Sequence, residues 1–421
     1  MFSLRRQILT IATLTLAHVA HGQAPPASTP DLSVIVEQQV RQLFESELAV
    51  LAVVANADAA KIDTIRQAMS RAVQGETKTI LDQISQGQAR ELAMSDQLKQ
   101  ALNSEVAKTL GAETAKLYEA DYAGREMFKR KAAQRSLLVV LDRMLSFSQE
   151  QESKVAKAFM NSWNDDWNGF ALTASQMGSR ILGTSPPGLP NDQIKAAMSE
   201  EQATILDGLL NIPPAQLGAP QELAKLEADQ TTHLAVSELK TLCKLTTGQA
   251  QTLEAAGKKA AAAIVAEKMT AITTLQDPQS GAKAAAWELW TRPTGVMLSN
   301  NTNWKNVLNS TLVGEQKKLV ANRTQRRERI ARVASVSSIV YALLGIEVGL
   351  SAKQMDEVTK VLSLEMPSEF AAASPQRQTE LILELPDQKF ARVLNEQQIA
   401  KLAQTRRKIQ TQLEAMRQQS R

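Results

Sequence analysis

The sequence predicts an all-α protein, and composition, proline distribution and hydrophobic periodicity all point to this class. Aromatic residues make up only 4% of the 421 residues, whereas the strong helix formers Ala, Leu, Gln, Lys and Glu dominate. No proline occurs between residues 31 and 182, which permits long helices there. Apolar residues such as Val36, Val40 and Phe44 recur at helical spacing, and no run of period-two alternation is bounded by hairpin turns.

The first 22 residues have the features of a secretory signal peptide. Two adjacent arginines precede a largely apolar run, and Ala20-His21-Gly22 supplies the small residues that a signal peptidase requires. The run is too short to span a bilayer, which takes ~20 apolar residues. We therefore expect a cleaved signal, with an uncleaved anchor as the alternative. The mature protein is expected to be periplasmic or secreted and to carry no transmembrane anchor.

Two parts of the chain share residues in the same order, which indicates an old tandem duplication. At an offset of 202 residues, Arg125-Glu126 aligns with Arg327-Glu328, and Ser136 aligns with Ser338. Further matches at this or nearby offsets are Leu117 with Leu319, Phe147–Gln151 with Leu350–Gln354, and Met198–Gln202 with Leu394–Gln398.

These matches and the proline-rich segments predict the organisation of the chain. The expected parts are a signal peptide (1–22), a Pro/Ala/Ser linker (23–30), an N-terminal helix (31–55), helical unit one (56–211), a connector (212–244), helical unit two (245–410) and a basic C-terminal tail (411–421).

A five-residue pattern recurs where helices are expected to begin. It consists of an apolar residue, a small polar residue, two variable residues and Gln. The small polar residue can accept a hydrogen bond from the first helical turn, and the Gln can reach back to the N–H of the cap. The closest copies are Leu172–Gln176, Met198–Gln202, Leu245–Gln249 and Leu350–Gln354, and looser copies are Ile84–Gln88, Phe147–Gln151, Leu312–Gln316 and Leu394–Gln398. The residues predicted to cap helices are Thr173, Gln176, Ser199, Gln202, Thr246, Gln249, Ser351 and Gln354.

These pentads resemble the LTxxQ motif of periplasmic helical proteins typified by the Spy and CpxP stress chaperones. The resemblance covers only the pentads and the helices that they open, and this chain is far longer than those family members. Kinship would imply a helical protein that holds unfolded clients or modulates an envelope stress sensor. Helix capping alone would select the same residues, so both explanations stay open.

The residue types used in catalysis are scarce. His233 is the only histidine beyond the predicted signal, and Cys243 is the only cysteine. A single cysteine excludes an intramolecular disulfide and a Cys-rich metal site. The common nucleotide-loop, zinc-protease and nucleophile-elbow motifs are absent. We therefore expect a protein that is not an enzyme, with no cofactor and no metal, and with Cys243 buried on an apolar helical stripe.

Two pairs of tryptophans are candidates for partner binding. Trp163 and Trp167 are four residues apart, and Trp287 and Trp290 are three apart, so each pair is expected to share a helix face. Such rings either pack in a core or line a groove for a ligand or client protein.

Two basic segments are the other candidates. The chain has 48 Lys and Arg against 44 Asp and Glu, and this near balance argues against a dedicated nucleic-acid binder. Basic residues nevertheless gather at matching places in the two predicted units. The candidate partner-binding residues are Arg125, Lys129, Arg130, Arg323, Arg327 and Arg332. They form either solvated helix faces or a surface for acidic proteins, lipid headgroups or anionic envelope polymers.

The sequence thus favours an exported, non-catalytic interaction protein that is chaperone-like and binds other proteins. The alternative is a structural or adaptor component of the cell envelope. A chaperone is expected to present apolar and basic side chains together, whereas an adaptor needs a fixed patch for one partner. The oligomeric state stays open.

Overall fold

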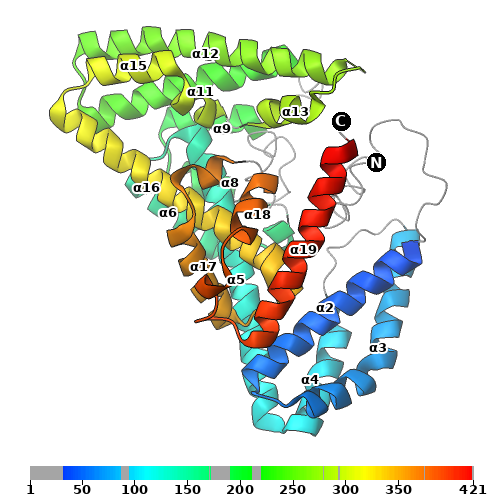
Figure 1. The fold of residues 1–421 in the computed structure, drawn as a ribbon. Coiled ribbons are helices and arrows are strands. Elements are labelled where there is room, and N and C mark those ends of the chain that lie inside the picture. Colours follow the sequence, from blue (N-terminus) through cyan, green and yellow to red (C-terminus); the bar gives the residue numbers. More distant parts are fainter. Residues whose placement is uncertain are drawn as a thin grey trace. The chain divides into compact units, whose positions relative to one another are not determined.

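A computed structural model confirms the all-α prediction. The residues that it describes form helices and no strands (Figure 1). They are residues 32–86, 94–169, 171, 190–210, 220–277, 279–292, 294–373 and 375–419. The predicted signal peptide and linker lie outside the described residues.

The first of two compact units takes its described residues from Met1–Lys129, Ile339–Leu364 and Leu383–Ser420. Its helices are α2 (Leu32–Val54), α3 (Ala59–Ser85), α4 (Asp96–Leu110), the first part of α5 (Ala112–Leu145), the π-helical segment η4 (Val340–Gly349), α17 (Ala352–Glu365), the 3-10 turn η6 (Asp387–Lys389) and α19 (Glu396–Gln419).

The second compact unit takes its described residues from Arg130–Ser338 and Glu365–Ile382. It contains the rest of α5, α6 (Gln149–Ser162), η2 (Asp165–Trp167), α8 (Asn191–Lys195), α9 (Glu200–Leu210), α11 (Pro220–Cys243), α12 (Thr247–Gln276), α13 (Lys283–Thr291), α14 (Thr294–Asn300), α15 (Thr302–Thr311), α16 (Gly314–Ile339), η5 (Ser368–Ala372) and α18 (Pro375–Leu383).

The compact units differ from the linear division that the sequence suggested. The expected unit 56–211 contributes to both of them, because α5 continues as one helix through the boundary at Lys129. The expected connector 212–244 contains α11, which packs along α12 as a principal helix of the second unit. Part of the expected C-terminal tail belongs to α19.

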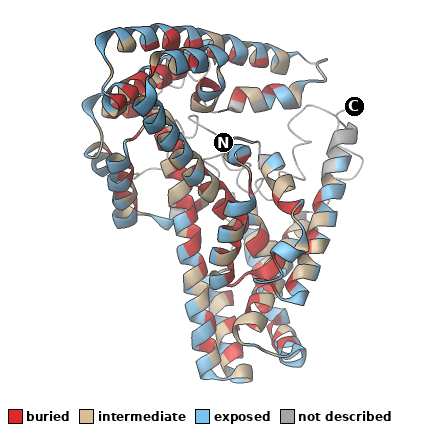
Figure 2. Cartoon of the chain, turned by 60° about the vertical axis from the view of Figure 1, so that its left-hand side comes forward, coloured by how far each residue is buried: buried red, intermediate tan, exposed pale blue. Residues whose placement is uncertain are grey.

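Apolar stripes on the helices build the cores of both units (Figure 2). In the first unit, Val36, Val40, Phe44 and Leu51 of α2 are buried, as their helical spacing predicts. Phe44 and Leu51 join a cluster with residues of α3, α4 and the start of α5.

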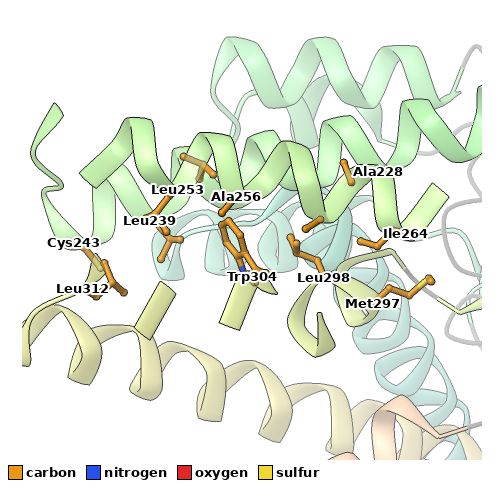
Figure 3. Close-up of a cluster of buried hydrophobic side chains, with 13 residues drawn as sticks. Ala228, Leu239, Cys243, Leu253, Ala256, Ile264, Met297, Leu298, Trp304 and Leu312 are labelled. Atoms are coloured by element: carbon orange, nitrogen blue, oxygen red, sulfur yellow. The ribbon is translucent and has the colours of Figure 1, made fainter. Parts of the chain in front are cut away.

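Trp304 fills the core between α11, α12 and α15 in the second unit (Figure 3). Its indole lies among Leu239, Leu253, Ala256 and Leu298, and all four of these side chains are buried. Small alanines on α12 leave room for the large ring, so large and small residues fill this core together.

One helix of the described chain is long and apolar enough to cross a membrane by length and composition. It spans Gly314–Gly349, and half of its apolar window is buried within the protein. Val340, Leu344 and Val348 of its η4 segment are buried, and η4 packs on α2 and α19. Packing in the core of the first unit therefore accounts for these three buried residues.

Candidate functional site

The pentads begin helices and form reciprocal caps. At the start of α17, the backbone N–H of Ser351 donates to Oε1 of Gln354 (3.0 Å), and the N–H of Gln354 donates to Oγ of Ser351 (3.2 Å). Two N–H groups that no helical carbonyl can reach are thereby satisfied. The same reciprocal bonds join Ser148 to Gln151, Ser199 to Gln202, Thr246 to Gln249 and Asn395 to Gln398.

The other three pentads are not among the reciprocal caps that the described residues form. The predicted caps Thr173 and Gln176 lie outside the described residues. Ile84 and Ser85 belong to the last turn of α3, so this pentad does not begin a helix there. In the loose copy Leu312–Gln316, Val313 has no side-chain oxygen to offer, and only its backbone N–H bonds to Gln316.

The capping glutamines also pair with one another. Nε2 of Gln354 donates to Oε1 of Gln398 (2.8 Å), and Nε2 of Gln398 donates back to Oε1 of Gln354 (3.0 Å). Each amide nitrogen also donates to a backbone carbonyl that lies two residues ahead of the other helix's cap residue. Gln354 donates to the carbonyl of Val393, and Gln398 donates to the carbonyl of Gly349. Because each Oε1 accepts the N–H of its own cap as well, each carboxamide uses both its nitrogen and its oxygen.

Two such pairs occur in the second unit. Nε2 of Gln151 is 2.6 Å from Oε1 of Gln202, and Nε2 of Gln249 is 3.0 Å from Oε1 of Gln316. Each pair fastens the starts of two helices to each other. The sequence indicates the caps but not the pairing, because the paired glutamines are 51 and 67 residues apart.

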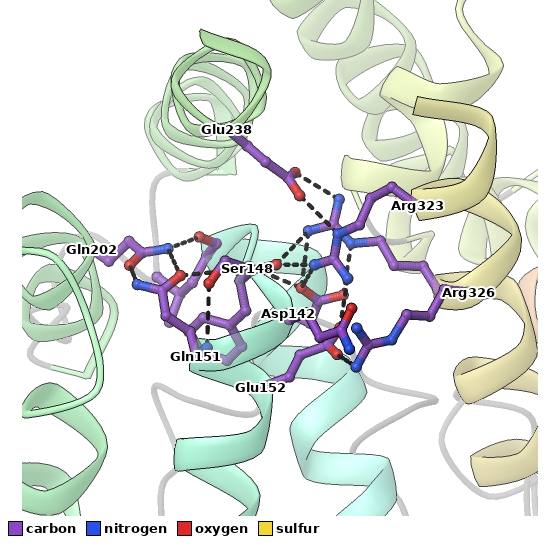
Figure 4. A network of polar contacts seen from close by, with 12 residues as sticks. Asp142, Ser148, Gln151, Glu152, Gln202, Glu238, Arg323 and Arg326 are labelled. Atoms are coloured by element: carbon purple, nitrogen blue, oxygen red, sulfur yellow. Dashed lines mark hydrogen bonds and ion pairs between the residues drawn. The ribbon is translucent and has the colours of Figure 1, made fainter. Parts of the chain in front are cut away.

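Arg323 lies in an ion-pair network (Figure 4), and Arg327 shares two of its carboxylates. Nη1 of Arg323 is 2.8 Å from Oε1 of Glu152, and its Nε is 2.9 Å from Oε1 of Glu238. Arg327 places Nε 2.9 Å from Oδ2 of Asp142 and Nη1 2.7 Å from Oε2 of Glu238. The carboxylates come from α5, α6 and α11. This arrangement corrects the expectation that these two arginines form an exposed basic surface, because the carboxylates neutralise them.

Arg326 completes this network. Its Nη2 is 2.5 Å from Oε2 of Glu152, so three guanidinium groups face three carboxylates. Burial lowers the pKa of Arg323, but the charge of Asp142 and the bonds to Glu152 and Glu238 outweigh this effect and raise it overall.

Arg125 has a similar environment in the first unit. Its Nη1 and Nη2 bind Oε1 and Oε2 of Glu47 at 2.7 and 2.6 Å, and its Nε binds Asp121 at 2.9 Å. Burial lowers the pKa of Arg125, yet the charge and hydrogen bonds of Glu47 raise it overall. The expectation of an exposed basic surface is therefore corrected for Arg125 too, and its role is to join α5 to α2.

The remaining candidate cations also have partners. Lys129 is buried, with Nζ 5.3 Å from the centre of the Tyr341 ring. Arg130 binds both carboxylate oxygens of Asp165, at 2.9 and 2.6 Å. Arg332 donates from Nη1 to the carbonyl of Met366 at 3.1 Å. These contacts hold helices to neighbouring segments within each unit.

The tryptophans are divided between core and surface. Trp167 and Trp290 are buried, whereas Trp287 is 53% exposed. Trp163 follows α6 and Trp167 ends η2, so this pair does not share one helix face as expected. Their rings meet edge-on, 5.2 Å apart, and Nε1 of Trp163 donates to Asn168 (3.1 Å). The two pairs are not gathered into a groove by any of these contacts.

An exposed apolar stripe on α5 is a candidate binding surface among the described residues. Leu117 and Met127 are 58% and 45% exposed, and Ala120 and Ala123 between them are also exposed. Spacings of three and four residues place these side chains on one side of the helix. The corresponding residue of α16, Leu319, is exposed as well. The sequence aligns Leu117 with Leu319, but no pattern in it indicates that either residue lies on the surface.

Cys243 is buried in the core that surrounds Trp304. We expect its thiol to react with a thiol reagent much more slowly in the native protein than in the unfolded chain. Burial, together with the charge of Glu238, raises the pKa of the thiol, and only the thiolate reacts. Labelling should therefore accelerate at a higher pH than for a free cysteine. Rates measured over a pH series test this, and a Cys-linked dimer under oxidising conditions would contradict it.

The described residues contain no cluster of His, Cys, Asp and Glu that could hold a metal ion. A polar hollow of about 280 Å³ lies between α2, η4 and α19 and is lined by residues including Glu45, Glu347 and Lys401. Comparison of the chain with protein-family models, with curated proteins and with solved structures returns no match.

Proposed function

We propose that this chain is an exported, non-catalytic helical protein that holds apolar segments of other polypeptides. The observation that carries the proposal is the exposed stripe of Leu117, Ala120, Ala123 and Met127 on α5. The resemblance of the pentads to the LTxxQ motif supports the same function, and the signal-like N-terminus supports export.

An apolar segment suits this stripe better than an anionic partner does. Contiguous exposed apolar side chains bordered by charged ones are typical of protein-binding surfaces. Lys116 and Glu113 border the stripe and pair with each other at 2.8 Å, which leaves little net charge there. Arg125, Arg323 and Arg327, which suggested an anionic partner, are already bound to carboxylates inside the units.

Substitution of the stripe tests the proposal. The intact protein should suppress aggregation of the reduced insulin B chain, an apolar unfolded peptide. The double variant Leu117→Asp, Met127→Asp should need about thirtyfold more protein for the same effect, because each of the two apolar side chains contributes ~1 kcal/mol to binding. Its melting temperature should stay unchanged, because both side chains are exposed.

Leu364→Asp is the matched control. Leu364 is 84% exposed and lies on α17, away from the stripe in sequence, so an aspartate replaces an exposed apolar residue elsewhere on the surface. This variant should retain full activity. If the intact protein does not suppress aggregation, the chaperone-like function is wrong and the envelope adaptor becomes the better proposal. If the double variant is fully active, the stripe is not the binding site.

A further inference from the structure

Two serines at matching positions of the duplicated sequence touch each other in the second unit. Ser136 on α5 aligns with Ser338 on α16 at the offset of 202 residues. Both are buried, and their hydroxyl oxygens are 2.9 Å apart. In an assembly of two equal parts, a residue meets its own counterpart where it lies on or beside a twofold axis.

The neighbouring contacts are reciprocal. Val139 packs with Ala331 in one cluster, and Lys129 lies against the ring of Tyr341. At the offset of 202, Val139 corresponds to Tyr341, and Ala331 corresponds to Lys129. Each contact is therefore the counterpart of the other, with the two parts of the chain exchanged. This reciprocity is the property of an isologous interface between two copies.

The order of the helices repeats along the chain in the same way. With the short helices α8, α13, α14 and α18 set aside, α2, α3, α4, α5, α6 and α9 correspond in order to α11, α12, α15, α16 with η4, α17 and α19. The glutamine pair of Gln151 and Gln202 joins α6 to α9, and the pair of Gln354 and Gln398 joins α17 to α19. The paired caps thus occupy matching places in the two series.

The compact units mix the two series. The first unit combines α2, α3 and α4 with η4, α17 and α19, which come from the other end of the chain. The second unit combines α11, α12 and α15 with α6 and α9. The last helices of each series therefore pack with the first helices of the other series. This exchange is the pattern of domain swapping.

We propose that the chain is a covalently linked pseudo-homodimer of two half-length copies, residues 32–210 and 220–419, that have exchanged their C-terminal helices. The partner that each half fits is the other half. The interface is built around Ser136 and Ser338. On this basis α11 is the counterpart of α2, so the expected connector and the expected N-terminal helix have the same structural role.

Cleavage of the intact protein tests the exchange. A protease recognition sequence is inserted between α9 and α11, within residues 211–219, and the purified full-length chain is cut there. The two fragments should elute together at the mass of the uncut protein and keep its helical circular dichroism, because neither compact unit is made from one half alone. Fragments that elute separately as folded halves would overturn the proposal.

A disulfide at the serine pair provides a second, independent measurement. Ser136→Cys and Ser338→Cys are combined with Cys243→Ala in the cleavable chain. Because the side-chain oxygens are 2.9 Å apart, we expect sulfur atoms at these positions to come within bonding reach of each other. The cut protein should therefore run as one band on a non-reducing denaturing gel and as two after reduction. Each single-cysteine variant is the control and should give two bands. Two bands from the oxidised double variant would overturn the interface.

Discussion

Replacing Arg323 by Met should lower the free energy of unfolding by about 3–5 kcal/mol, the typical effect of removing one partner from a buried ion pair. Asp142, Glu152 and Glu238 all lie within ion-pair distance of this guanidinium and have little access to water. Met has a similar length but no charge, so these carboxylates lose a cation that they share. Denaturant unfolding of the variant and the original protein measures the difference.

Lys318 provides the control on the same helix. It forms an exposed pair with Glu315 at 2.7 Å. Lys318→Met should change the stability by less than about 1 kcal/mol, because solvent screens exposed pairs. If the Arg323→Met variant is as stable as the original protein, the ion-pair network does not stabilise the fold. The arginines would then again be candidates for binding a partner.

Replacing Gln398 by Ala should cost about 2–4 kcal/mol of stability, since unpaired buried polar groups and a cavity add their effects. The side chain is only 2% exposed. Its loss leaves the carbonyl of Gly349, the amide of Gln354 and the backbone N–H of Asn395 each without one hydrogen bond. Thermal and denaturant unfolding both measure the effect.

Gln404→Ala is the matched control for this substitution. Gln404 is an exposed glutamine on the same helix, α19, so its truncation should change stability by less than about 0.5 kcal/mol. A comparable loss in both variants would mean that the paired caps do not determine the effect.

The sequence predicts the features that depend on neighbouring residues. The helical spacing of Val36, Val40 and Phe44 indicates a buried stripe, and the pentads indicate helix starts, because both features are local. The partners of Arg323 are not local. Glu238 and Glu152 are 85 and 171 residues away, so the charge excess along α16 is misleading when it is considered alone.

Long-range packing also determines which helices form each compact unit and where the tryptophan rings lie. The matching offsets reveal a repeated order but cannot show which copy packs with which. Trp163 and Trp167 have the spacing of a shared helix face, but α6 ends at Ser162 and a 3-10 turn follows. The exposed stripe around Leu117 could be found only by knowing which side of α5 the other helices cover.

The first compact unit contains helices from both ends of the chain. It therefore cannot form until the ribosome has synthesised almost the whole chain. The hydroxyl of Ser46 on α2 bonds to the carbonyl of Gly345 on η4, and 299 positions separate these residues. At about 5–20 residues per second, a ribosome needs roughly 15–60 s to produce the second residue after the first. During that interval the nascent helix α2 has no native partner for the face that later packs on η4. A chain in this state is exposed to aggregation and proteolysis, and holding factors that act on nascent chains would protect it.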